Sequence, residues 1–132
     1  MVEEEKSRNI RVVAENNDFL AFTFFAARFP FEIWILPKKH QLSFETIPAG
    51  ERENMARVIY EVLGMLNKTL RFPPFNWWIH TSPRQDHVGN FYHWHMEIAP
   101  RVSKFGGYEM GSGIVIDVVS PELAAQFLKK VS

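Results

Sequence analysis

The stretch Phe91-Tyr-His-Trp-His-Met-Glu-Ile98 decides the fold of this chain, because apolar and titratable side chains alternate along it. In a β-strand, successive side chains point to opposite faces of the sheet. The apolar face then carries Tyr92, Trp94, Met96 and Ile98. The other face carries His93, His95 and Glu97. The pattern predicts a strand with one face in a core and a row of titratable groups on the other.

Further strands are predicted before and after this stretch, from apolar runs bounded by turn residues and prolines. These runs cover residues 10–15, 19–25, 31–36, 75–81, 91–99 and 114–119. Both faces of the run 19–25 are apolar, so we expect this strand to lie inside the sheet. A polar loop, 82–90, joins the strand 75–81 to the strand 91–99, and a glycine-rich stretch covers 104–113.

Two helices are predicted. Residues 48–70 carry an apolar stripe at helical spacing, formed by Met55, Val58, Ile59, Val62, Leu63, Leu66 and Leu70. A shorter helix begins at Ser120-Pro-Glu122, where a hydroxyl cap, a proline in the first turn and a carboxylate favour a helix start. Antiparallel strands with one long and one terminal helix indicate the α+β class.

The composition limits the class of protein. The 132 residues are one domain's length, and 46% of them are hydrophobic, enough for a core. The 15 basic and 15 acidic side chains cancel, which argues against an electrostatic nucleic-acid binder. The lack of cysteine excludes disulfides, thiolate zinc sites and thiol catalysis. No apolar run suits a membrane span and the acidic start is unlike a signal peptide, so we expect a cytoplasmic protein.

The histidines of the deciding stretch have a neighbour with the same chemistry. His80 lies in the preceding predicted strand, and antiparallel pairing across the loop 82–90 would bring it beside His93 or His95. Imidazoles at alternate strand positions can bind a transition metal or place a nucleophile beside a phosphate ester. We therefore expect three histidines and Glu97 to converge on one face of the sheet.

The glycine-rich stretch contains a second candidate site, Lys104-Phe-Gly-Gly-Tyr-Glu109. Glycines let a backbone approach a phosphate closely, and a lysine supplies positive charge. Tyr108 and Glu109 can hydrogen-bond sugar hydroxyls. The composition alone also fits a loop in which Tyr108 packs and Glu109 is solvated.

Several motifs occur in a fixed order. They are Phe29-Pro-Phe-Glu-Ile-Trp-Ile-Leu-Pro-Lys-Lys-His40, Trp77-Trp-Ile-His-Thr-Ser-Pro83, His93-Trp-His95, Lys104-Phe105 with Gly107-Tyr-Glu-Met110, and Ser120-Pro-Glu-Leu-Ala-Ala-Gln-Phe127. Over nearly the whole chain this order resembles the C-terminal half of galactose-1-phosphate uridylyltransferases, of the histidine-triad superfamily. The resemblance implies a histidine-triad-like half-barrel in one domain, residues 1–132. It would hold an antiparallel sheet of about five strands, one long helix and a short C-terminal helix.

The resemblance also implies site residues. A divalent metal, zinc or iron, would be bound by His80, His93 and His95. A loop that contacts the sugar phosphate would include Lys104, Phe105, Tyr108 and Glu109. The family's fourth metal ligand is a glutamate of the N-terminal half, for which Glu97 is a substitute in this chain.

The family reaction passes UMP from UDP-glucose to galactose 1-phosphate through a uridylyl-histidine. Its nucleophile lies in a His-Pro-His motif of the N-terminal half, and this sequence contains no such motif. We therefore expect a C-terminal half that binds a nucleotide sugar or hexose 1-phosphate and is inactive without an N-terminal half. In superfamily terms, however, His95 stands at the position of the nucleophile.

Two alternatives remain open. One is a homodimeric histidine-triad nucleotide hydrolase or transferase with His95 as its nucleophile. The other is a non-catalytic nucleotide-binding module that retains the fold. We expect exposed aromatic surface where a partner half docks, and hence a homodimer or larger assembly. Nucleic acid and membranes are not expected as partners.

Overall fold

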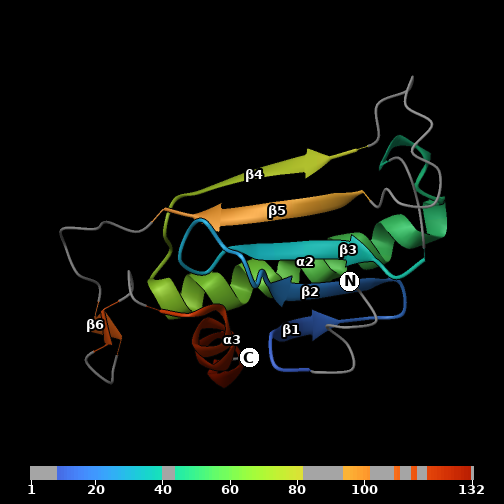
Figure 1. Cartoon of the computed structure of the whole chain (residues 1–132). Coiled ribbons are helices and arrows are strands. Elements are labelled where there is room, and N and C mark those ends of the chain that lie inside the picture. Colours follow the sequence, from blue (N-terminus) through green and yellow to red (C-terminus); the bar gives the residue numbers. More distant parts are fainter. Residues whose placement is uncertain are drawn as a thin grey trace.

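The centre of the molecule is a five-stranded antiparallel sheet with the strand order β1-β2-β3-β5-β4 (Figure 1). The computed structural model describes residues 9–39, 44–81, 94–101, 109–110, 114–115 and 119–131. The strands of the sheet are β1 (Val12–Glu15), β2 (Phe19–Thr23), β3 (Ile33–Pro37), β4 (Phe75–His80) and β5 (His95–Pro100). The predicted α+β class and the predicted number of strands in the sheet are confirmed.

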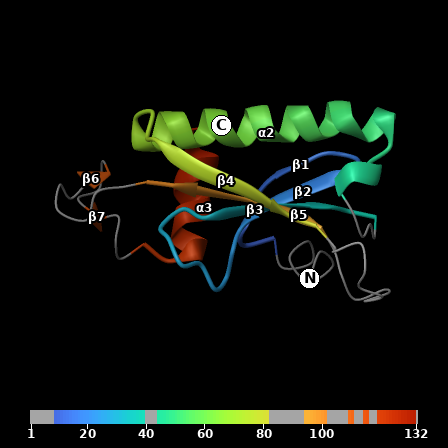
Figure 2. The ribbon, with the colours of Figure 1, turned by 90° about the horizontal axis from the view of Figure 1, so that it is seen from above.

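The long helix covers one face of this sheet (Figure 2). A short 3-10 helix, η1 (Phe44–Thr46), precedes the long helix α2 (Ala49–Leu70), and α3 (Pro121–Lys130) follows near the C-terminus. Pro48, where the helix was predicted to begin, is the N-cap of α2, and the first helical residue is Ala49. The N-cap of α3 is Ser120, as predicted, and its Oγ accepts a hydrogen bond from the backbone N–H of Leu123.

The main core lies between the helices and the sheet. Alternate residues of the central strands face it: Phe19, Ala21, Ile33, Ile35, Met96 and Ile98. They pack against the apolar stripe of α2 and against Ala125 and Leu128 of α3. A smaller cluster on the other face contains Val12, Leu20, Phe22 and Leu36. Strand β2 contributes to both clusters, which confirms its predicted position inside the sheet.

Two expectations for the C-terminal third were wrong in detail. Within the predicted glycine-rich loop lies strand β6 (Glu109–Met110), which pairs with β7 (Ile114–Val115) in a separate two-stranded sheet. Of the strand predicted over 114–119, the first two residues lie in β7 and Val119 is not part of a strand, while 116–118 lie outside the described residues. Gly111-Ser-Gly113, between the two strands, has the composition of a tight turn, and this signal predicts a hairpin.

Candidate metal centre

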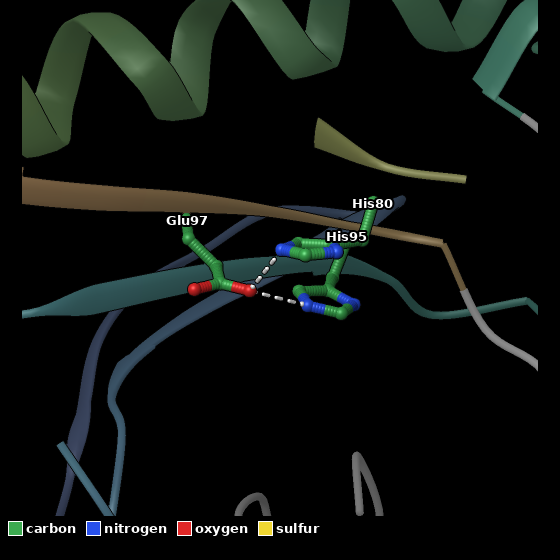
Figure 3. A group of neighbouring side chains, drawn as sticks. All are labelled: His80, His95 and Glu97. Atoms are coloured by element: carbon green, nitrogen blue, oxygen red, sulfur yellow. Dashed lines mark hydrogen bonds and ion pairs between the residues drawn. The ribbon is translucent and has the colours of Figure 1, made fainter. Parts of the chain in front are cut away.

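The register of β4 on β5 brings the predicted histidines together. His80 lies opposite His95, and Trp78 lies opposite Glu97. Because side chains alternate along β5, Trp94, Met96 and Ile98 enter the main core while His95 and Glu97 project on the other face. Figure 3 shows His80, His95 and Glu97 on the side of the sheet away from the long helix. Of the two predicted neighbours of His80, His93 and His95, the register selects His95.

The three side chains converge on one carboxylate oxygen (Figure 3). The Nε2 atoms of His80 and His95 each lie 2.9 Å from Oε2 of Glu97. The two imidazole rings are stacked, with centroids 4.9 Å apart and an interplanar angle of 16°. The exposed fraction of the side chain is 4% for Glu97, 16% for His95 and 49% for His80. The carboxylate therefore forms the buried end of the site, and His80 forms its opening.

Arg28 occupies the second carboxylate oxygen. Its Nη2 donates a hydrogen bond to Oε1 of Glu97 over 3.0 Å, while its own side chain is 62% exposed. Burying an ionised carboxylate without a partner costs several kcal/mol of stability, because the ion loses its hydration. Arg28 therefore compensates the charge of Glu97 from the solvent side and leaves Oε2 to the imidazoles.

This donor set fits a transition metal. Two imidazole nitrogens and one carboxylate oxygen lie within 4.8 Å of one another. Zinc and iron accept such mixed ligands, and bonds of about 2.0–2.2 Å place two ligands of one ion about 3–4 Å apart. An imidazole nitrogen that donates its proton to Oε2 has no lone pair for an ion. A metal bound at this site would therefore replace these hydrogen bonds, with each imidazole directing the lone pair of Nε2 at the ion and carrying its proton on Nδ1.

A row of stacked aromatic rings continues from the histidines across the sheet. The ring centroids of Trp34 and His95 are 4.1 Å apart, with an interplanar angle of 10°. The ring centroids of Phe24 and Trp34 are 3.7 Å apart, with an interplanar angle of 2°. Neither Trp34 nor Arg28 was predicted from the sequence as a residue of the site. The alternation of Ile33, Trp34 and Ile35 is a signal for Trp34, since it places the indole on the face opposite the core.

Most of the other predicted site residues are not placed by the structure. His93, Lys104, Phe105 and Tyr108 lie outside the described residues. The backbone of Glu109 belongs to β6, and the position of its side chain is not described. The loop for the sugar phosphate, the third histidine and the nucleophilic role of His95 stay predictions.

The sequence has relatives among sugar-nucleotide enzymes. An ADP-glucose phosphorylase of Arabidopsis thaliana is 36% identical over 131 residues, which cover 98% of this chain and 37% of the relative. A galactose-1-phosphate uridylyltransferase of Thermotoga maritima is 30% identical over 128 residues, which cover 91% of this chain and 40% of the relative. The chain thus spans less than half the length of these relatives.

Solved structures agree with this grouping. An Arabidopsis thaliana ADP-glucose phosphorylase with bound ADP-glucose has a TM-score of 0.80 and 34% identity, over 96% of this chain and 42% of its own. A histidine-triad-like protein of Bartonella henselae has a TM-score of 0.68 and 17% identity, over 99% of this chain and 95% of its own. That second likeness shows the fold alone.

These comparisons confirm the histidine-triad-like fold, and they favour the uridylyltransferase relatives over a free-standing histidine-triad hydrolase. In the described part of the chain, no helix combines the length and apolar character of a membrane span. Residues 1–132 match the family described as galactose-1-phosphate uridyl transferase, C-terminal domain. The chain therefore belongs to this family.

Proposed function

We propose that this chain acts as the metal-binding and sugar-nucleotide-binding half of a nucleotidyltransferase, in partnership with an N-terminal half that carries the nucleophile. The observation that carries this proposal is the convergence of His80, His95 and Glu97 on one point. A row of solvated side chains does not need a common centre, whereas a metal site does.

The substrate class follows from the relatives. One of them has been solved with bound ADP-glucose, and another is named for galactose 1-phosphate. We propose that this chain contacts a nucleotide sugar or a hexose 1-phosphate through Lys104, Phe105, Tyr108 and Glu109. A lysine among glycines suits a phosphate, and Tyr108 and Glu109 suit sugar hydroxyls. The nucleobase and the sugar are to be determined by assays with UDP-glucose and ADP-glucose.

In this proposal His80 and His95 hold a zinc or iron ion, with Glu97 as a third donor and His93 as a fourth. A bound ion here would supply positive charge and would cross-link β4 to β5. Arg28 keeps one oxygen of Glu97 occupied, so the carboxylate offers its other oxygen, Oε2, to the ion. The side chains of this chain would thus fix the β4 edge of the sheet and leave phosphoryl chemistry to the partner half.

The alternative nucleophilic role of His95 is less compatible with its surroundings. An attacking imidazole needs the lone pair of its nitrogen directed at phosphorus. In this structure Nε2 of His95 is directed at the Glu97 carboxylate instead. A carboxylate at this position also repels the anionic phosphate of a nucleotide.

We propose that the partner half docks along β4. This strand pairs with β5 on one side and is an edge of the described five-stranded sheet. Phe75 and Trp77 are exposed on it. Beside it lies an apolar groove of about 440 Å³, lined in part by Phe44, Ile47, Met55, Ile59, Trp77 and Ile79. An edge strand next to an apolar groove suits a partner that extends the sheet.

The metal assignment is tested with His80→Ala. We expect the purified wild-type chain to bind about one equivalent of zinc or iron, and the variant to lose it, because the substitution removes one of the ligands. Elemental analysis after dialysis measures both. Glu53→Gln, which changes an exposed carboxylate of α2, is the matched control and should retain the metal. Metal retained by His80→Ala contradicts the assignment.

The catalytic assignment is tested by mixing the chain with the N-terminal part of a family member. We expect uridylyl or adenylyl transfer to appear only in the mixture. Transfer by this chain alone, with a trapped nucleotidyl-histidine that His95→Ala abolishes, would instead establish the nucleophilic role of His95.

A further inference from the structure

Glu32 has a buried carboxylate and is not one of the proposed metal donors. Its residue is 1% exposed, and it lies immediately before β3. Both of its carboxylate oxygens accept hydrogen bonds. Oε2 accepts from Nε1 of Trp34 over 2.8 Å, and Oε1 accepts from the backbone N–H of Arg28 over 3.2 Å. The guanidinium Nε of Arg28 lies 3.9 Å from the same Oε1.

The backbone around Glu32 is fixed as firmly as its side chain. Its N–H donates to the carbonyl of Phe29, and its carbonyl accepts from the N–H of Phe24, each over 3.2 Å. The preceding residue, Phe31, is buried and has a φ of 64°, which is a strained conformation for a side chain other than glycine. Such strain persists only where surrounding contacts hold the chain, so the connection between β2 and β3 has a defined shape.

Both partners of Glu32 also contact metal donors. Trp34 stacks on the imidazole of His95, and Arg28 hydrogen-bonds Oε1 of Glu97. Glu32 therefore contacts residues that in turn contact two of the three donors, His95 and Glu97, and its single carboxylate connects the two. Within the described residues, His80 is linked to this network only through His95 and Glu97.

We propose that Glu32 is a positioning residue for the metal centre, acting through Trp34 on His95 and through Arg28 on Glu97. The inference rests on the proposed metal binding. By holding the indole, Glu32 fixes the plane against which the His95 ring stacks. By holding Arg28, it keeps Oε1 of Glu97 occupied, so that the carboxylate binds an ion through one oxygen. Residues behind metal ligands commonly contribute about 10–100-fold to metal affinity.

The main test is Glu32→Gln. A glutamine has an acceptor oxygen at only one of the two carboxylate positions, so its NH2 group faces either the indole N–H of Trp34 or the backbone N–H of Arg28. We expect a loss of zinc affinity of at least about 10-fold, measured by competition with a chelator. We also expect a changed cobalt absorption spectrum, which reports ligand geometry and would not respond to a small loss of stability. Arg57→Gln, which breaks an exposed ion pair on α2, is the matched control and should change neither readout.

Two further variants make the test independent of how well Glu32→Gln folds. Trp34→Phe keeps a ring against His95 and removes the indole N–H, and Arg28→Gln alters an exposed side chain. Each should weaken zinc binding with a native circular dichroism spectrum. The double variant Glu32→Gln/Trp34→Phe should lose less zinc affinity than the sum of the two single losses, because both substitutions break the same hydrogen bond, from Nε1 of Trp34 to Glu32.

The outcomes separate the two proposals. Zinc binding by the wild-type chain with unchanged affinity and cobalt spectrum in all three single variants overturns the role of Glu32 and leaves the metal centre intact. Failure of the wild-type chain to bind zinc or cobalt overturns the metal centre, and the role of Glu32 with it. Full additivity in the double variant shows that Glu32 and Trp34 act separately, which also contradicts the inference.

Discussion

At the scale of single residues, the site is organised by the difference in exposure between Glu97 and Arg28. The carboxylate is almost completely buried, and the guanidinium that compensates it is mostly in water. Removal of either group breaks the same ion pair, but the group left behind differs. A guanidinium left in water is solvated at once, whereas a carboxylate left in the protein is not. The pair should therefore respond asymmetrically to substitution.

We expect Arg28→Gln to destabilise the metal-free protein more than Glu97→Gln. The first variant leaves a buried charge without its cation, at a cost of about 1–3 kcal/mol in the free energy of unfolding. Glu97→Gln removes that charge, and the amide oxygen still accepts a hydrogen bond. Urea denaturation at neutral pH in the presence of a chelator measures both values. A larger loss for Glu97→Gln would show that the carboxylate, not its burial, governs this part of the fold.

The sequence predicted that His80 lies beside His93 or His95, because period-two alternation and a loop between two strands determine faces and neighbours, but it did not select between the two. It also offered Glu97 as a donor. It did not predict the supporting residues Arg28 and Glu32. They precede β3 in an irregular connection, where no periodicity relates sequence position to direction. Arg28 acts through a contact with Glu97, 69 residues away in the chain, and Glu32 acts through Arg28 and Trp34.

At the scale of elements, the first turn of α3 is tied to two strands. Thr23, at the end of β2, donates its hydroxyl to the carbonyl of Pro121 over 2.7 Å. Nη1 of Arg11, next to β1, donates to the Glu122 carboxylate over 3.0 Å. Hydrogen bonding from its own backbone N–H, and then from Arg11, lowers the pKa of Glu122 below its ordinary value of 4.5. The helix start is thus stabilised most when Glu122 is ionised.

We expect Glu122→Gln to lower the melting temperature at neutral pH by a small amount, corresponding to less than about 1 kcal/mol because the carboxylate is partly exposed. The pKa of Glu122 is lower in the folded state than in the unfolded state. The stabilisation is therefore complete above the ordinary value of 4.5 and is lost as the pH falls through the lower folded pKa. The difference between wild type and variant should disappear in acid.

The control for this experiment is Ser120→Ala, which removes the neighbouring hydroxyl cap. It should cost about 1 kcal/mol and keep most of that cost in acid, because the hydrogen bond from the N–H of Leu123 to its hydroxyl does not titrate; only the smaller part that lowers the pKa of Glu122 is lost. A difference between wild type and Glu122→Gln that is constant with pH would mean that shape, and not charge, accounts for the role of Glu122.

Helices were predicted more closely than short strands. The stripe of α2 repeats over several turns, and its predicted end at residue 70 is also the end in the structure. Met65 was missed in the stripe because it lies at its margin, although it is buried. Strands β6 and β7 have two residues each, too few for any periodicity to appear, so only the turn composition between them was informative.

At the scale of the whole molecule, the sheet has one edge that suits a partner. Strand β4 carries exposed aromatic residues beside an apolar groove. Soluble proteins usually protect such an edge with charges, prolines or short strands. In β4, by contrast, Phe75-Asn-Trp-Trp-Ile-His80 contains no lysine, arginine, aspartate, glutamate or proline. This edge is the part of the described surface where we expect association.

We expect Trp77→Lys to abolish association with the partner half, or with a second copy of the chain, at an unchanged melting temperature. A lysine at a strand edge disfavours pairing with another strand, and Trp77 is 56% exposed, so its loss leaves the core intact. Sedimentation velocity measures the assembly. Tyr60→Lys, on the exposed side of α2, should not affect it. Association that survives Trp77→Lys would place the interface elsewhere.

The alternation along β5 also limits how this protein can change in evolution. The main-core residues Met96 and Ile98 are interleaved, one by one, with the candidate ligands His95 and Glu97. Insertion or deletion of a single residue in this strand would direct an imidazole and a carboxylate into the core and expose apolar side chains where the ligands stood. Insertions and deletions within β5 should therefore disrupt the core and the candidate metal site together, whereas a substitution on one face leaves the other face unchanged.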